Sequence, residues 1–143
     1  MMKSCIKIFA ALFAVAMMAS GCTKETEDLI VGLWEVQYTS RTMYEDQATT
    51  RSYLNEDESW FYKFKKDNTG YIDHFGYEEF TYTINGETLT ITTSVDMDGK
   101  GSGGSTYTET FNIDKLDEKE AVIRMLHESP DSDYRIHMKR VGN

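Results

Sequence analysis

The chain has 143 residues, a formal net charge of −9 and an aromatic content of 13%. A chain this acidic repels phosphate backbones, and it contains no basic stripe, so nucleic-acid binding is not expected. The length suits one domain with a modest core and is too short for two.

The first 21 residues have the layout of an export signal. Lys3 and Lys7 precede an almost wholly apolar run over residues 8–18, which is too short to span a membrane as a permanent helix. The sequence that follows, Ala19-Ser20-Gly21-Cys22, resembles the lipobox of bacterial lipoproteins, in which the cysteine receives a diacylglycerol and the preceding peptide bond is cut. We therefore expect residues 1–21 to be a lipoprotein signal peptide and Cys22 to be the lipid anchor. The alternative is an ordinary signal peptide that is cut elsewhere.

The mature chain is expected to begin with an acidic tether over residues 22–28. Loss of the signal removes two lysines and no acid, so the formal charge becomes −11. The tether resembles the one that, in one group of Gram-negative bacteria, sends lipoproteins to the outer face of the outer membrane. We expect an outer-membrane anchor at the cell surface, with the periplasmic face as the alternative. Cys5 leaves with the signal and Cys22 is acylated, so the core must hold the fold without disulfides.

From Leu29 onward the chain alternates apolar and polar residues as half-buried strands do. In the first strand, Trp34, Val36 and Tyr38 share one face. Eight strands are expected, at residues 30–39, 59–66, 69–76, 77–84, 87–95, 106–114, 120–127 and 133–141. Most connections are short, so successive strands should be neighbours and close into an antiparallel up-and-down barrel. We predict one all-β domain over residues 29–143.

Turn signals set the register of three expected hairpins. Asn85-Gly86 accepts the two positive φ values of a type I′ turn, and this turn would pair Tyr82 with Leu89. Apolar residues then meet on one face of the hairpin and threonines on the other, so pattern and turn agree. Two further turns, at Asp67-Asn68 and around Pro130, would pair Phe64 with Tyr71 and Met125 with Ile136. A longer loop from Asp67 to Gly70 is the alternative for the first of these turns and would shift its register.

Three stretches carry a family resemblance: residues 29–36 (LIVGLWEV), 64–70 (FKKDNTG) and 82–91 (YTINGETLTI). With the basic pair Lys139-Arg140 they resemble the lipocalin-like domains of small bacterial lipoproteins, over residues 29–141. In that family a Gly-x-Trp opens the first strand and a basic pair ends the last one. The resemblance implies an eight-stranded barrel with a cup and specifies no ligand.

Candidate binding residues lie inside the expected barrel and in its first connection. The connection from Ser40 to Glu58 is long for a structureless loop, so Met43, Tyr44, Tyr53 and Leu54 are candidates for a lid over the cup or for a surface loop. Alternation places Asp73 and Glu109 among inward aromatic residues, where each would anchor a polar group of a ligand or be hydrated at the mouth. The expected ligand-binding residues are Trp34, Tyr38, Met43, Tyr44, Tyr53, Trp60, Tyr62, Phe80, Tyr82, Glu109 and Phe111.

A second long connection, Asp96 to Ser105, begins with Asp-x-Asp-Gly as calcium loops do. Lys100 stands at the next ligand position, and Tyr107 stands where a bidentate glutamate is needed. We expect a glycine-rich hairpin end and no metal.

Catalytic signals are weak. Glu78 and Glu79 are adjacent on a strand and point to opposite faces, so they do not form a carboxylate pair. His74, His127 and His137 lack metal-ligand spacing, and no thiol remains as a nucleophile. We expect no catalytic residues and no cofactor.

The leading hypothesis is a monomeric, membrane-anchored, non-catalytic barrel that binds a small apolar or amphipathic ligand. An eight-stranded barrel is of a size whose interior is either filled by side chains or holds one small ligand. The alternative is a solid-core module that contacts a protein or a glycan through its outer wall and loops. An open interior would favour the first hypothesis, and an exposed aromatic patch would favour the second.

Overall fold

The computed structural model describes residues 25–95, 105–127 and 129–143. The predictions about the export signal, Cys22 and residues 96–104 fall outside this part of the chain. The strands are β1 (Gly32–Met43), β2 (Thr49–Tyr53), β3 (Phe61–Phe64), β4 (Thr69–Asp73), β5 (Tyr77–Asn85), β6 (Thr88–Val95), β7 (Ser105–Leu116), β8 (Glu120–Met125) and β9 (Ser132–Gly142). A short helix over residues 25–30 precedes β1.

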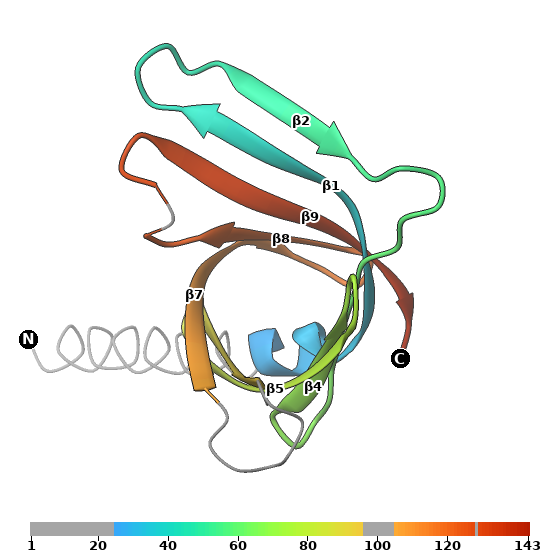
Figure 1. The fold of residues 1–143 in the computed structure, drawn as a ribbon. Coiled ribbons are helices and arrows are strands. Elements are labelled where there is room, and N and C mark those ends of the chain that lie inside the picture. Colours follow the sequence, from blue (N-terminus) through green and yellow to red (C-terminus); the bar gives the residue numbers. More distant parts are fainter. Residues whose placement is uncertain (1–24, 96–104, 128) are drawn as a thin grey trace, which may run out of the picture.

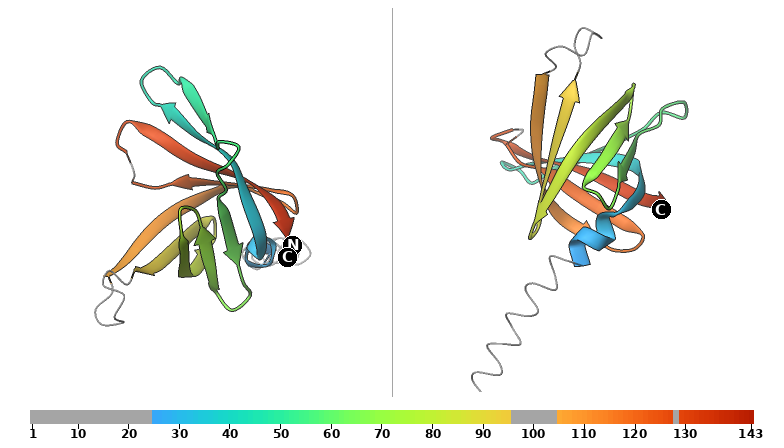
Figure 2. Two further views of the ribbon diagram at one scale, coloured as in Figure 1. Left: turned by 45° about the vertical axis from the view of Figure 1, so that its right-hand side comes forward. Right: turned by 90° about the horizontal axis from the view of Figure 1, so that it is seen from below.

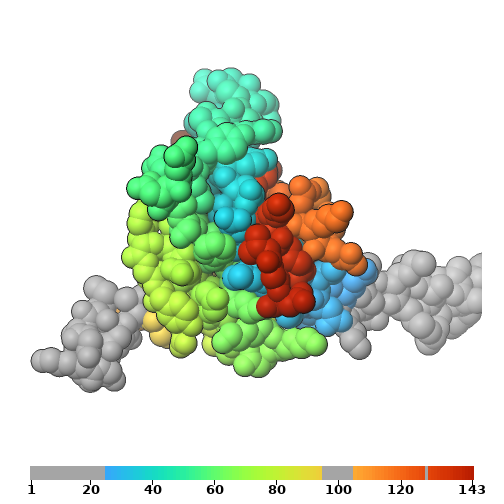
Figure 3. All heavy atoms as spheres, turned by 90° about the vertical axis from the view of Figure 1, so that its right-hand side faces the viewer, coloured from blue at the N-terminus to red at the C-terminus, as the bar shows by residue number. Residues whose placement is uncertain are grey.

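Eight of these strands form a closed antiparallel barrel (Figure 1). β1 pairs with β3 along part of one edge, strands β3 to β9 follow in chain order, and β9 returns to the other edge of β1. The predicted all-β, up-and-down barrel is therefore confirmed. β2 is an additional strand that pairs only with the second half of β1, so this hairpin stands out from the barrel (Figure 3).

Two of the predicted hairpin registers are wrong by two residues. At the β5–β6 turn, Tyr82 pairs with Ile91 and Asn85 pairs with Thr88, which leaves Gly86 and Glu87 in the loop. Only Gly86 has a positive φ there (+63°), as in a type II′ turn. In the β8–β9 hairpin, Met125 pairs with Tyr134 and not with Ile136. A shift of two keeps every side chain on its predicted face, so the hydrophobic pattern tolerates either register.

The third predicted register, between β3 and β4, is wrong by one residue. The side chains of β4 therefore lie on the opposite face of the sheet from the predicted one. Phe64 pairs with Gly70 because the β3–β4 loop has three residues and ends at Asn68, whose φ is +63°. The Asp67 carboxylate accepts hydrogen bonds from the backbone N–H and hydroxyl of Thr69, which fixes this loop. Tyr71 therefore faces outward, and so does Asp73, which is exposed.

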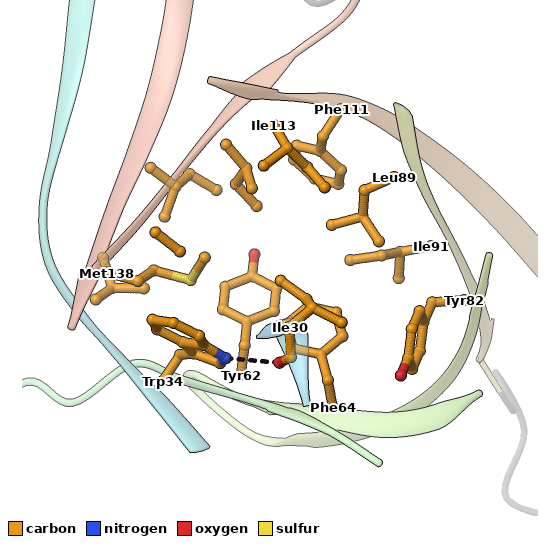
Figure 4. Close-up of a cluster of buried hydrophobic side chains, with 14 of the residues drawn as sticks. Ile30, Trp34, Tyr62, Phe64, Tyr82, Leu89, Ile91, Phe111, Ile113 and Met138 are labelled. Carbon is orange, nitrogen blue, oxygen red and sulfur yellow. Dashed lines mark hydrogen bonds between the residues drawn. The ribbon is translucent and has the colours of Figure 1, made fainter. Parts of the chain in front are cut away.

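The barrel interior is filled by apolar side chains that point inward from all around the sheet (Figure 4). The buried set comprises Ile30, Trp34, Val36, Tyr62, Phe64, Phe80, Tyr82, Leu89, Ile91, Phe111, Ile113, Ala121, Ile123, Ile136 and Met138. Burial of these side chains is the main source of stability, since the described residues contain no cysteine to form a disulfide.

The helix over residues 25–30 lies across one end of the barrel (Figures 1 and 2). Ile30 is fully buried in the core, and its carbonyl accepts a hydrogen bond of 2.8 Å from Nε1 of Trp34 (Figure 4). Residues 25–28, which the sequence assigned to the tether, are thus helical. This helix therefore closes one end of the barrel.

Arg140, on β9, stabilises this closed end. Its guanidinium donates hydrogen bonds to the carbonyls of Leu29 and Val31 and lies 4.3 Å from the centre of the Trp34 ring. Gly32 makes the approach possible, because a Cβ atom there would lie 2.1 Å from Nη1 of Arg140 and its φ is +150°. The Gly-x-Trp sequence and the terminal arginine therefore have a structural role in one cluster.

Candidate functional site

The other end of the barrel is open and contains a pocket of about 340 Å³. Its lining combines aromatic, aliphatic and charged side chains: Arg41, Trp60, Tyr62, Glu109, Phe111, Met125, Tyr134 and Ile136. We refer to this site as the mouth pocket. Below it the interior is packed, so the cup expected from the sequence is confined to the mouth.

Trp60 is held on one wall of the mouth pocket by His74. The two rings stack with centres 4.2 Å apart and an angle of 4° between their planes. His74 Nε2 lies 2.9 Å from Oε1 of Glu58, and this hydrogen bond lowers the pKa of the Glu58 carboxyl. A carboxylate, an imidazole and an indole thus form a chain that fixes the indole plane.

The indole Nε1 of Trp60 is buried and has no hydrogen-bond acceptor among the described residues. The Tyr62 hydroxyl is close enough for Trp60 to lower its pKa, but the pair does not meet hydrogen-bond geometry. Burial, followed by the nearby charge of Glu109, raises the pKa of Tyr62 far above its ordinary value. Tyr62 is therefore a neutral phenol at any physiological pH. Trp60, which lines the pocket, carries a buried N–H donor without a partner among the described residues.

Two charged residues line the mouth pocket, Arg41 from β1 and Glu109 from β7. Arg41 donates a 2.9 Å hydrogen bond to the Ser132 hydroxyl and lies 5.3 Å from the centre of the Tyr134 ring. Glu109 comes from β7, where alternation had placed it inward. The pocket thus offers an apolar wall together with one cationic and one anionic group.

The predicted ligand-binding residues separate into three groups. Trp60, Tyr62, Glu109 and Phe111 line the mouth pocket together. Trp34, Phe80 and Tyr82 are buried in the packed interior. None of the three lines the mouth pocket, although Phe80 borders a separate pocket of about 390 Å³ between β4, β5 and β6. The Tyr82 hydroxyl donates to the carbonyl of Lys65 at 2.6 Å.

The third group lies outside the barrel. Tyr38 was predicted to share the inner face with Trp34, but a β-bulge between Val36 and Tyr38 inserts Gln37 and reverses the alternation. Tyr38 therefore pairs with His137 on the outer face. Asp73 is also outside, because of the register of β4.

The connection from Ser40 to Glu58 is largely a β-hairpin and not a structureless loop. β1 continues to Met43, and the Tyr44 hydroxyl donates a 2.6 Å hydrogen bond to Asp133 at the start of β9. None of the expected lid residues, Met43, Tyr44, Tyr53 and Leu54, lines the mouth pocket. The hairpin is attached to β9 through the Tyr44–Asp133 hydrogen bond, while β2 projects from the barrel wall.

A larger hollow, of about 1170 Å³, lies on the outer face of this sheet, and we call it the outer groove. Cross-strand pairing places Tyr53, Tyr38, His137, Val122 and Lys115 in one row across β2, β1, β9, β8 and β7. The Tyr38 ring stacks on His137 with centres 4.1 Å apart and lies 5.2 Å from the Tyr53 ring. Sequence reasoning missed this row, since only the bulge brings Tyr38 to the outside.

His137 is fixed in the groove by more than stacking. Its Nε2 lies 2.8 Å from the Ser40 hydroxyl. Partial burial, followed by the charges of Arg51 and Arg135, lowers the pKa of His137. The imidazole is therefore neutral at neutral pH, and one face of its ring packs against the Tyr38 ring.

Among the residues that the structure describes, no group of three or more His, Cys, Asp or Glu side chains is arranged to hold a metal. That same part of the chain has no helix with the length and apolar character of a membrane span. No protein-family model matches the chain, and comparisons with curated proteins and with solved structures gave no match. The class that the fold defines is a closed eight-stranded antiparallel barrel.

Proposed function

We propose that the protein is a membrane-anchored, non-catalytic binding protein that holds one small amphipathic molecule in the mouth pocket. The observation that carries this proposal is the buried indole N–H of Trp60, which has no acceptor in the described structure. A buried donor without a partner costs about 1–3 kcal/mol, so such groups are uncommon without a reason. A ligand that brings a carbonyl or carboxyl oxygen to this N–H would remove that cost.

The lining of the mouth pocket supports an amphipathic ligand of modest size. A volume of about 340 Å³ lies at the low end of the range for small-molecule sites, roughly 300–1,000 Å³. The pocket would suit a molecule of about ten non-hydrogen atoms on that scale. Phe111, Met125 and Ile136 would take up the apolar part, while the indole N–H would orient the polar end.

The position of the closed end supports capture of a ligand from the side of the barrel that faces away from the membrane. The described part of the helix that plugs the barrel starts at residue 25, three residues after Cys22 in the sequence. If Cys22 carries the lipid, the closed end lies next to the membrane and the mouth faces away from it. The mouth pocket would then be open to the cell exterior, or to the periplasm if the protein stays on the inner face.

The test uses the full mature chain in detergent micelles and its two indole N–H signals in ¹H–¹⁵N NMR spectra. Sodium octanoate and octanamide both carry an acceptor and have about ten non-hydrogen atoms, the size that the pocket suits. Each should shift the Trp60 signal downfield in a saturable way, while the Trp34 signal, already bonded to Ile30, stays in place. Octylammonium has the same chain without an acceptor and should not produce this shift.

The variant Trp60→Phe keeps a ring over His74 but removes the N–H. We expect octanoate affinity, measured by calorimetry, to fall about 2- to 10-fold, which corresponds to one net hydrogen bond. Tyr77→Phe, at an exposed tyrosine that does not line the pocket, is the matched control. Equal affinities for Trp60→Phe and the unmodified chain, or no saturable shift with either acceptor-bearing probe, would rule out the proposal.

The alternative function, a solid-core module that contacts a protein or a glycan, is favoured by one specific observation. The barrel interior is packed below the mouth, while the exposed Tyr53 ring and the half-buried rings of Tyr38 and His137 line a hollow on the outer wall that is larger than the mouth pocket. Such a module would be tethered at the same position by Cys22. The two functions are compatible, because the mouth pocket and the outer groove share none of their lining residues.

A further inference from the structure

We propose that the free edge of β2 is a docking site for an extended peptide segment that carries an acidic side chain. The segment would add one more strand to the sheet by pairing its backbone with β2. This site is separate from the mouth pocket. Three observations support it: the unpaired backbone edge, the attachment of the hairpin to the barrel and the charge of Arg51.

One edge of β2 has no strand beside it. β2 is the last strand in the sheet order and, within the described chain, pairs only with β1. All five of its residues are exposed, and the hairpin stands out from the barrel (Figure 3). An edge strand presents a row of unpaired backbone N–H and C=O groups, which is a template for pairing with another chain.

The register shows which backbone groups face the free edge. The N–H of Met43 donates to the carbonyl of Ala48 at 3.0 Å, so these two residues form a hydrogen-bonded pair. Bonded and non-bonded pairs alternate along an antiparallel ladder. Thr50 and Ser52 therefore bond to β1, whereas the odd-numbered residues of β2 turn their N–H and C=O groups outward. Three donors and three acceptors are thus available on alternate residues, as an added strand requires.

The devices that usually protect a sheet edge are weak in β2. Natural edge strands are often guarded by proline, by lysine or by a bulge. β2 has the sequence TTRSY, without proline or lysine, and its pairing with β1 has no register shift. Its one charged side chain, Arg51, lies over the Tyr38 ring on β1, 5.2 Å from the ring centre. The guanidinium is therefore directed back over the sheet and leaves the edge accessible.

The edge is held in place before a partner binds. The second half of β1 pairs with β9 along its other side. Two side-chain hydrogen bonds add to this pairing, from Tyr44 to Asp133 at 2.6 Å and from Arg41 to Ser132 at 2.9 Å. A preformed template lowers the entropy cost of association, since only the peptide has to be ordered.

The charge at the edge selects an acidic partner. Arg51 has no carboxylate partner among the described residues, and the strand contains no acid. A glutamate of the added strand opposite Arg51 would form a cross-strand pair of opposite charge, which is stabilising. Tyr53, two residues further on and 66% exposed, would pair with an aromatic side chain on the same face. We therefore expect a segment with an acidic and an aromatic residue two positions apart.

A second copy of this chain suits the edge less well. A two-fold pairing of all five residues would set the Arg51 side chains of the two copies opposite each other, and like charges at such positions are destabilising. Each copy also has a formal charge of −9, so the two copies repel each other. An acidic segment of another protein meets the cationic edge without the first of these costs.

The test uses the full mature chain in detergent micelles and a fluorescent ten-residue peptide. The peptide consists of serine and threonine with one tyrosine and one glutamate two positions apart. We expect saturable binding in fluorescence polarisation, and at least tenfold weaker binding when lysine replaces the glutamate. Arg51→Glu, at an exposed position, should reverse this order of affinities. Lys66→Glu makes the same change of charge in the exposed β3–β4 loop and should keep the original order.

Backbone methylation separates strand addition from binding through side chains alone. Two further peptides carry an N-methyl group, one on the glutamate and the other on the next residue. Only one of these two N–H groups can face β2, so one peptide should bind at least tenfold more weakly and the other should bind normally. In hydrogen-exchange NMR, the bound peptide should slow exchange of the Arg51 and Tyr53 amides at least tenfold. Exchange of the Ser52 amide, already bonded to β1, should change little.

Several results would overturn the proposal. These are the absence of saturable binding, an unchanged order of affinities in Arg51→Glu, and equal effects of the two methyl groups. Protection of the Arg51 amide without peptide, together with a dimeric mass in sedimentation, would show that a second copy occupies the edge. The Trp60 indole signal should stay in place when the peptide binds, so this site and the mouth pocket can fail separately.

Discussion

Replacement of Arg140 by methionine tests whether one side chain seals the closed end of the barrel. The guanidinium donates hydrogen bonds to three backbone carbonyls, those of Leu29, Val31 and Glu118, and covers the Trp34 ring. Methionine keeps an apolar stem over that ring but cannot donate. The carbonyls would then depend on water, and the helix would lose its main polar attachment to β9.

The expected loss of stability follows from these contacts. Hydrogen bonds from a charged donor contribute about 1.5–3 kcal/mol each when buried, and a cation–π contact contributes about 0.5–2 kcal/mol. Arg140 is half-buried and water can replace part of its bonding, so we expect a total loss of about 3 kcal/mol, well below the sum of these values. For a domain of this size the melting temperature should fall by about 10 °C.

Urea unfolding, followed by the fluorescence of the buried Trp34, measures this loss. The matched control is Lys139→Met, at the other member of the basic pair, whose ammonium forms no ion pair in the described chain. This control should change the free energy of unfolding by no more than about 0.5 kcal/mol. A loss below about 1 kcal/mol for Arg140→Met, or equal losses for both variants, would refute the structural role assigned to Arg140.

Four further predictions concern the anchor, two turns and pH. Cys22→Ala should release the protein from membranes into the soluble fraction, and unchanged fractionation would exclude the lipid anchor. Gly86→Val should lower the free energy of unfolding by roughly 1 kcal/mol or more, because φ is +63° and no atom lies near enough to clash, so the cost is backbone strain alone. Phe75 is 89% exposed with a φ of +56°, so Phe75→Asn should raise the melting temperature, since asparagine tolerates this conformation better. Because the pKa of His137 is lowered on folding, the unfolded chain protonates first as the pH falls. Stability should therefore decrease below pH of about 6.5, the usual histidine value, and His137→Gln should flatten the pH dependence of urea unfolding.

The barrel itself was predictable because its signal is distributed over the whole chain. Alternation with a period of two recurs in each strand, and short connections leave few ways to order the strands. Glu109 was placed inward correctly for the same reason, since no irregularity interrupts β7 between Ser105 and Ile113. Where the alternation is continuous, a residue's face can be read from the sequence.

The errors that placed a side chain on the wrong face occurred where one residue interrupts that alternation. The bulge at Gln37 moved Tyr38 to the outer face, and the three-residue loop at Asn68 moved Asp73 out of the barrel. Neither feature changes the composition or the local pattern enough to be recognised in advance. The bulge depends on how β1 pairs with the distant strand β9, and the loop depends on the turn that Asp67 and Thr69 form between β3 and β4.

The sequence by itself determined the class of the fold, most of the apolar set that fills it and four of the eight residues that line the mouth pocket, Trp60, Tyr62, Glu109 and Phe111. These follow from hydrophobic burial, which depends on spacing along the chain. Tertiary structure alone decided the registers, the sealing of one end by Arg140 and the row of Tyr53, Tyr38 and His137 on the outer wall. Those features arise from contacts between residues far apart in sequence, whose positions are fixed only when the barrel closes.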